Sequence, residues 1–393
     1  MHSPLNDPAR AVPQASARDP RIDVFRGLAL VMIFINHVPR NVFEHYTNRN
    51  WGFSDAAEAF VFLSGAAAGL AYSSGFFSRP YWPAIARVWA RARTLYFVHL
   101  STTMMAIGIF AAGAAWFGLT ELLTMNNLHR ILDAPLGVMI GLPTLGHQLG
   151  YFNILPLYLV LLLMAPAMLW LGVRRPWLTM AISVVVWALA GQFRINLPNY
   201  PNEGGWFFNP FSWQILFVSG LLTGILLKRG QRFVPKIGWL MWVCGLYALF
   251  IFIWRMVPPV AEIGRAALGS LAELGVPYYL VSFDKSFLAL TRMSHFLALA
   301  YLVSCLVWVH RVSASRWVEP LRLLGQNGLA VFATGSVLAF VAQAIKRGAG
   351  DHLWLDLVLL GTGFAIQFAL AWTLRKTRQT TARKKAAATR VTA

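Results

Sequence analysis

An arginine and a histidine on one apolar segment constrain this chain more than any other feature. Arg26 and His37 both lie in the run 24–38, most of whose other residues are apolar. At about 100° per residue, their eleven-residue separation is about three helical turns, so a helix places both side chains on one face, about 16 Å apart along its axis. A membrane helix does not turn such a face toward lipid, because a charge there costs several kcal/mol. We therefore expect a polar cavity inside a helix bundle, with a titratable imidazole in it.

The composition indicates that this bundle lies in a membrane. Hydrophobic residues make up 57% of the 393 positions and charged residues only 12%, against about 25% charged in soluble domains. Sixteen tryptophans and 27 phenylalanines suit aromatic belts at the membrane surfaces. We expect an all-α, polytopic membrane helix bundle of about ten transmembrane helices. The apolar runs are residues 24–38, 56–74, 94–117, 151–173, 177–192, 211–227, 237–257, 288–310, 324–345 and 353–374.

The basic residues predict the orientation of the bundle. With ten spans and a cytoplasmic N-terminus, about two thirds of the 34 lysines and arginines lie on the cytoplasmic side, and most acidic residues lie on the other side. Because this distribution follows the positive-inside rule, both termini are expected in the cytoplasm. Anionic membrane lipids account for the net charge of +19, and no recognition motif accompanies it, so a nucleic-acid partner is not expected.

Three regions are expected along the chain. Residues 1–20 are polar and contain no apolar core, so they are predicted to be a disordered cytoplasmic tail and not a signal peptide. Residues 21–375 form the membrane domain, and residues 376–393 form a basic, solvated cytoplasmic tail. The segment 135–149 is apolar but broken by glycine and proline, so it could be re-entrant, interfacial or an eleventh crossing. The two cysteines fall in apolar runs without metal-type spacing, and no metal site is expected.

Two carboxylates at the start of the second apolar run are candidate partners of His37. Asp55 and Glu58 are i,i+3 neighbours on one helical face, near the end of the first helix that carries His37. A carboxylate beside an imidazole orients its tautomer and raises its basicity, which suits general-base catalysis. Two structural alternatives stay open. Asp55 and Glu58 could cap a helix N-terminus, and Asp23 could pair with Arg26 while His37 is an ordinary buried histidine.

Further polar and aromatic residues are candidate substrate ligands. They lie beside Arg26 and His37, at the start of the eighth run, where the ninth run enters the membrane, and in an outer loop. They are Asp23, Asn36, Arg292, His295, Gln326, Asn327 and Trp206. The loop rings, which include Tyr200, Tyr278 and Tyr279, could stack on sugars or form the aromatic belt. No P-loop, HExxH or GxSxG motif is present, which argues against nucleotide hydrolysis, zinc-protease and serine-hydrolase chemistry.

A set of ordered motifs resembles one family of bacterial membrane enzymes. Residues 21–28 and 34–37 resemble the first helix of the OpgC-like proteins, inner-membrane succinyltransferases that modify osmoregulated periplasmic glucans. These proteins belong to the superfamily of integral-membrane acyltransferases, whose signature is an arginine and a histidine separated by ten residues. Further matches follow in order between residues 20 and 375. They are residues 52–58, 61–65, 155–158, 208–214, 284–285, 295–301 and 324–327.

The resemblance implies an O-acyltransferase of the bacterial inner membrane. Its donor substrate would be a cytoplasmic acyl-CoA such as succinyl-CoA, with no tightly bound cofactor, and its acceptor a hydroxyl of a periplasmic glucan or related polysaccharide. The resemblance assigns the base to His37 and the paired arginine to Arg26, but it does not fix the acyl group. From the residues alone, the alternative is a secondary transporter or flippase for an ion or a lipid-linked sugar, although no matched pair of broken helices is evident.

Overall fold

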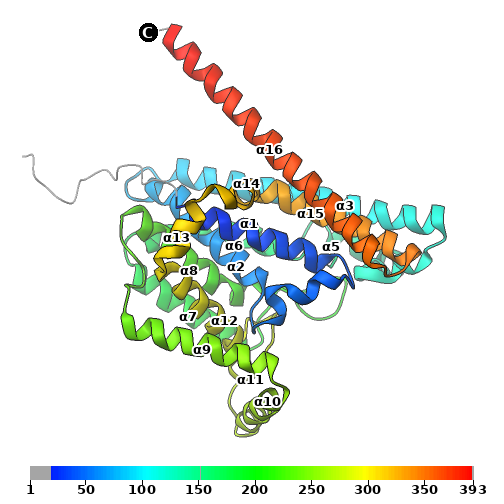
Figure 1. The fold of residues 1–393 in the computed structure, drawn as a ribbon, viewed down its shortest axis with the longest axis horizontal. Helices are drawn as coiled ribbons and strands as arrows, with labels where there is room; N and C mark the ends of the chain where they lie inside the picture. The colour runs from blue at the N-terminus through cyan, green and yellow to red at the C-terminus, as the bar shows by residue number, and fades with distance from the viewer. Residues whose placement is uncertain (1–18, 151, 392–393) are drawn as a thin grey trace, which may run out of the picture.

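Helices form most of the chain in the computed structural model, which describes residues 19–150 and 152–391 (Figure 1). The long helices are α1 (Pro20–His37), α2 (Ala56–Tyr72), α3 (Trp82–Phe117), α6 (Ile154–Gly172), α7 (Pro176–Gln192), α8 (Pro210–Lys228), α9 (Gly238–Met256), α10 (Pro258–Glu273), α12 (Leu290–Cys305), α15 (Gly328–Ala349) and α16 (Leu353–Val391). The short ones are α4 (Arg130–Asp133), α5 (Pro135–Gly141), α11 (Tyr278–Val281), α13 (Val307–Ala314) and α14 (Glu319–Gln326). Within the described ranges no strand forms, which confirms the all-α prediction.

Seven helices of the described chain are long and apolar enough to cross a membrane. They are α2, α3, α6, α8, α9, α15 and α16, and α12 with α13 gives an eighth span if this pair, bent by 75°, is counted as one. The helix α7 is apolar but shorter, and α1 carries three charged side chains in its first two turns. The multi-pass bundle is therefore confirmed, while ten crossings and cytoplasmic termini stay predictions.

The broken apolar segment 135–149 does not form a helical crossing. Its helix α5 has seven residues, about 10 Å of rise, against a hydrocarbon core of about 30 Å. The helix packs on the loop around Tyr200, since a Cβ added at Gly141 would lie 2.4 Å from the Tyr200 carbonyl oxygen. The segment folds back on the bundle, so the parity of the spans does not depend on it.

The predicted tails differ in what the structure describes. Residues 1–18 lie outside the described residues, so the predicted N-terminal tail is not tested. Described structure begins with Asp19, whose side chain accepts a hydrogen bond from the Arg21 amide and caps α1. The basic segment beyond residue 375 continues α16 as far as Val391, and this helix extends well beyond the bundle (Figure 1).

Helices α2 and α8 pack backbone to backbone at the centre of the bundle. A Cβ added at Gly65 would lie 2.0 Å from the carbonyl oxygen of Phe217, and one at Gly220 would lie 1.9 Å from that of Phe62. No side chain fits such a contact, so glycine is required on both helices. Gly65 and Gly69 form a GxxxG pattern, which is typical of closely packed helices in membranes. In the apolar stretch of α8, 83% of the residues are buried inside the protein, as expected for a central helix.

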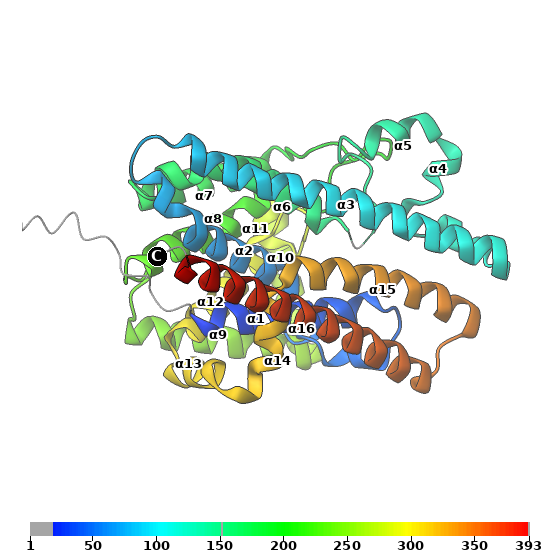
Figure 2. The same cartoon turned by 90° about the horizontal axis from the view of Figure 1, so that it is seen from above.

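One end of the bundle, which we call the His37 end, collects several helix termini. Helix α1 ends there at His37, and residues 38–55 lead through the 3₁₀ turns η2 (Val42–Tyr46) and η3 (Asn48–Asn50) into α2. Helix α12 also begins there, since its first turn contacts the start of α2. Helix α15 lies beside α1 and packs against α16, which meets α1 through an edge-to-face contact between Phe34 and Phe364 (Figure 2). These termini bring remote charged residues together.

Candidate functional site

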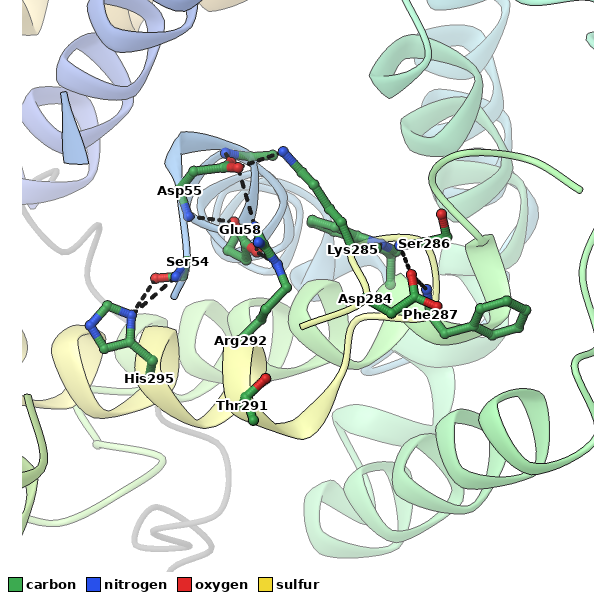
Figure 3. A network of polar contacts seen from close by, with 12 residues as sticks. Ser54, Asp55, Glu58, Asp284, Lys285, Ser286, Phe287, Thr291, Arg292 and His295 are labelled. Atoms are coloured by element: carbon green, nitrogen blue, oxygen red, sulfur yellow. Dashed lines mark hydrogen bonds and ion pairs between the residues drawn. The ribbon is translucent and has the colours of Figure 1, made fainter. Parts of the chain in front are cut away.

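Four charged side chains form an ionic cluster at the start of α2 (Figure 3). The Lys285 Nζ lies 2.5 Å from Asp55 Oδ2. The Arg292 guanidinium donates to Glu58 Oε1 at 2.6 and 2.8 Å and to Asp55 Oδ2 at 3.2 Å. The Glu58 side chain is fully buried and Arg292 is 12% exposed. Two cations balance two carboxylates, and buried charges of this kind are stable only when they are paired.

The same carboxylates determine where α2 begins. Asp55 Oδ1 accepts a hydrogen bond from the Ala57 amide, and Glu58 Oε2 accepts one from the Asp55 amide, which completes a capping box. The capping alternative is therefore correct, and it coexists with the ionic cluster. Burial alone would raise the pKa of Asp55, but the Lys285 ammonium and the Arg292 guanidinium outweigh it and hold that pKa below its ordinary value.

His295 holds the turn that leads into α2. Its Nδ1 accepts a hydrogen bond from the Ser54 amide at 3.2 Å and lies 2.8 Å from Ser54 Oγ. Because an amide donates to Nδ1, the neutral ring carries its proton on Nε2. A Cβ added at Gly52 would lie 2.2 Å from the ring, so only glycine fits there. His295 is buried against this turn, and its ring nitrogen Nδ1 is used to hold Ser54.

His37 lies at the edge of the ionic cluster. It is the last residue of α1 and is half-buried. Asp55 and Lys285 are the charged groups that act electrostatically on its imidazole. Of the two predicted carboxylate neighbours, Asp55 is therefore the one whose charge reaches the ring, while Glu58 is bound to Arg292 and to the Asp55 amide.

Arg26 forms a second polar site, nearer the start of α1 than His37. Its guanidinium donates to the carbonyl oxygen of Leu63 at 3.0 Å and to that of Gly325 at 3.4 Å. Arg26 and Arg91 both lie close enough to Tyr158 to act electrostatically on its hydroxyl. Two guanidinium groups from α1 and α3 and a phenol from α6 thus gather in one region of the bundle interior.

The other predicted polar residues make contacts within the fold. Gln326 donates to the buried carboxylate of Asp23 at 3.4 Å, close to Arg26 in the chain. Asn36 accepts a hydrogen bond from the Thr47 hydroxyl at 2.8 Å. Asn327 donates to the carbonyl oxygens of Leu323 and Ala371, at 2.9 and 3.3 Å, and joins the end of α14 to α16. Asn327 therefore holds helices together and does not share the contacts of Gln326.

Trp206 does not present the stacking surface that the sequence suggested. The residue is only 4% exposed, and its indole N–H donates to the carbonyl oxygen of Pro198 at 3.1 Å. Tyr279 is buried as well, whereas Tyr200 and Tyr278 are about half exposed. The physical reason is that this loop packs onto the bundle core, so its largest ring fills space inside the protein. A sugar-stacking role at Trp206 is incompatible with this position.

Two cations outside the predicted set join these sites. Lys285 belongs to the ionic cluster. The sequence could have indicated it, because Lys285 lies in one of the motifs that resemble the family and stands seven residues before Arg292. Arg91 lies near Arg26, but in the sequence it is one of several arginines at the start of α3. Only the packing of α3 against α6 distinguishes it from its neighbours.

Comparison with known families bears on both sites. A family model described as OpgC protein matches residues 18–379, nearly the whole chain. The chain belongs to the OpgC family. No curated protein and no solved structure gives a match. Membership of the OpgC family supports a glucan-modifying, acyltransferase-like role, and the matched range contains the ionic cluster, His37 and the Arg26 site.

Proposed function

We propose that this OpgC-family protein is a membrane O-acyltransferase of the bacterial inner membrane. It moves an acyl group, which we take to be succinyl, from a cytoplasmic acyl-CoA to a hydroxyl of a periplasmic glucan. One observation carries the proposal. His37 and Arg26 lie on a single helix about 16 Å apart along its axis. The Asp55–Lys285 pair lies within electrostatic reach of His37, and Arg26 and Arg91 both lie within electrostatic reach of Tyr158.

The acceptor half of the reaction uses His37 as general base. Its imidazole takes the proton of the sugar hydroxyl as the oxygen attacks the thioester carbonyl carbon. The Asp55 carboxylate stabilises the imidazolium that forms, and the nearby Lys285 ammonium stabilises negative charge on the carbonyl oxygen. The C–S bond then breaks, the ester remains on the sugar, and CoA leaves as a thiolate that takes up a proton. A base of this kind contributes about 10²–10⁴ in rate.

The donor half of the site lies at Arg26. Its distance from His37 is too great for both side chains to touch one reacting atom, so Arg26 anchors a remote part of the donor. Guanidinium groups bind phosphate and carboxylate oxygens through two parallel hydrogen bonds. Arg26 and Arg91 together provide two such groups beside the Tyr158 hydroxyl. An acyl-CoA, which carries phosphates at one end and the thioester at the other, fits this separation.

Mass spectrometry of periplasmic glucans tests the proposal. Cells with the gene should carry an acyl substituent that deletion strains lack, and the mass of the substituent identifies it. The variant His37→Ala should give unsubstituted glucan at normal protein abundance. His45→Ala is the matched control, because His45 is an exposed histidine at the same end of the bundle. Substituted glucan in the His37→Ala strain would refute the role of His37, and an unchanged pattern after gene deletion would refute the acceptor.

A donor-binding assay separates the two halves of the site. Purified His37→Ala protein should still bind acyl-CoA, because the donor is held at Arg26. Arg26→Lys should weaken donor binding, since an ammonium cannot reproduce the planar guanidinium fork. Equal donor affinity in wild type and Arg26→Lys would contradict the assignment. The transporter alternative predicts movement of a solute without any change in its mass, so the same glucan analysis excludes or supports it.

A further inference from the structure

A second ionic network, outside the candidate site, surrounds the segment that follows His37. Lys346, near the end of α15, is fully buried, and its Nζ lies 2.6 Å from Asp356 Oδ1 at the start of α16. The Asp356 side chain is 3% exposed. The same Nζ lies 3.3 Å from Asp351, which pairs on the surface with Arg40 at 2.9 Å. A lysine and an aspartate are thus buried together at the His37 end of the bundle.

This network and its neighbours bind the backbone at the end of α1. The last four carbonyls of a helix have no partner within the helix. Side chains supply donors here. Gln343 donates to the His37 carbonyl at 3.4 Å, and Lys346, one turn later on α15, donates to the Arg40 carbonyl at 3.1 Å. Asn41 donates to the Ile35 and Val38 carbonyls at 2.8 and 2.6 Å.

Asp356 completes the attachment on the other side of the same segment. Its Oδ2 accepts a hydrogen bond from the Val42 amide at 3.2 Å while Oδ1 holds Lys346. The ion pair therefore joins two points of the chain, the Arg40 carbonyl and the Val42 amide, directly after His37. Arg40 itself has a backbone φ of 53°, so the chain turns sharply at this place.

Stability alone does not explain a buried pair of this kind. Replacing a buried ion pair by apolar residues of similar volume is often neutral or stabilising, because desolvation offsets much of the attraction. The pair instead fixes the course of the backbone, since Lys346 holds the Arg40 carbonyl and Asp356 holds the Val42 amide. A displacement of about 1 Å at a catalytic group can cost about 10²-fold in rate.

We propose that Lys346 and Asp356 are positioning residues that fix the end of α1, and through it the direction of the His37 side chain. The inference rests on the proposed function, because it assigns a device to that same base. Neither residue touches substrate. Gln343 assists them, since it holds the His37 carbonyl itself and accepts a hydrogen bond from Asn126 at 3.1 Å.

A paired substitution tests the proposal. Lys346→Met with Asp356→Leu removes both charges and leaves similar volume, so membrane abundance and melting temperature in detergent should match wild type. We expect kcat to fall about 10–100-fold, with KM for acyl-CoA unchanged within about twofold because Arg26 is not affected. The matched control is Arg347→Met, which breaks a solvent-exposed ion pair with Glu121 on the same turn of α15 and should leave kcat unchanged.

A direct measurement on His37 makes the test independent of turnover. Modification of His37 by diethyl pyrocarbonate, followed by peptide mass spectrometry, should be several-fold faster in the double variant than in wild type or Arg347→Met. Unchanged modification and unchanged kcat would overturn the positioning role. Should the double variant fail to accumulate, Asp356→Asn decides by the same two measurements, because it removes the charge that holds Lys346 with little change in shape and leaves Asp351 near the ammonium. Loss of activity in every variant with unchanged His37 reactivity would also overturn it. Wild-type protein that transfers no acyl group, with faster His37 modification in the variants, would refute only the proposed function.

Discussion

Removal of Arg292 should destabilise the protein strongly, because it strands a buried carboxylate. In Arg292→Met, Glu58 loses both hydrogen bonds from its cationic partner, at 2.6 and 2.8 Å, and keeps only the one from the Asp55 amide. Lys285 remains as the cation at Asp55. Glu58 is fully buried, so no water replaces the lost donor. Breaking a buried pair by removing one partner costs about 3–5 kcal/mol. At roughly 2 °C per kcal/mol for a large domain, the melting temperature should fall by about 6–10 °C.

Thermal unfolding in detergent, followed by tryptophan fluorescence, measures this effect. The matched control is Arg194→Met, since the Arg194–Asp284 pair has an arginine that is 53% exposed, and such surface pairs contribute about 0–1 kcal/mol. The double variant Arg292→Met with Glu58→Gln should recover more than half of the loss, because the amide still accepts the Asp55 hydrogen bond without a charge. A melting temperature of Arg292→Met equal to that of Arg194→Met would refute the buried-charge reasoning.

Four further outcomes are expected. Asp55→Asn should lower the melting temperature at pH 7. Its difference from wild type should begin to shrink only as the pH falls below about 4, and should be lost as the pH falls through the lowered folded pKa, because a carboxylate whose pKa is lowered on folding stabilises fully above its unfolded value; a difference at pH 3 as large as that at pH 7 would contradict this. Gly220→Val should abolish accumulation in the membrane, measured by immunoblotting, because its side chain would overlap the Phe62 carbonyl. Trp206→Ala should cost about 3–5 kcal/mol of stability and leave the KM for glucan unchanged in the protein that folds. Reporter fusions at Gly350 and at the C-terminus should report opposite sides of the membrane, and a common side would refute the span assigned to α16.

The fold class was predictable because apolar length alone decides it. Any run of about 20 apolar residues must satisfy its own backbone hydrogen bonds in lipid, and a helix does so locally. The start of α2 was predictable for a similar reason. Asp55 and Glu58 have the spacing of a capping box, which depends on four consecutive residues and no tertiary contact.

Features that depend on distant contacts could not be read from the sequence. The break between α12 and α13 falls at Leu306, within a continuous apolar run that contains no proline or glycine there. Lys346 and Asp356 stand in separate segments, and nothing local indicates that one neutralises the other. Trp206 belongs to a polar loop, and its burial results from packing onto the core. In each case the partner that decides the structure is remote in the chain.

The glycine contacts between α2 and α8 limit how this protein can move. Four glycines, at positions 65, 69, 220 and 224, meet carbonyl groups of the facing helix within about 2 Å of where a Cβ would lie. Sliding one helix along the other by a single residue would bring side chains to these points, so shear between packed helices is blocked here. The carboxylates at the start of α2 therefore stay fixed relative to α8. In the proposed reaction, any opening that admits a donor from one side and an acceptor from the other has to come from rigid-body movement of the outer helices against α2 and α8.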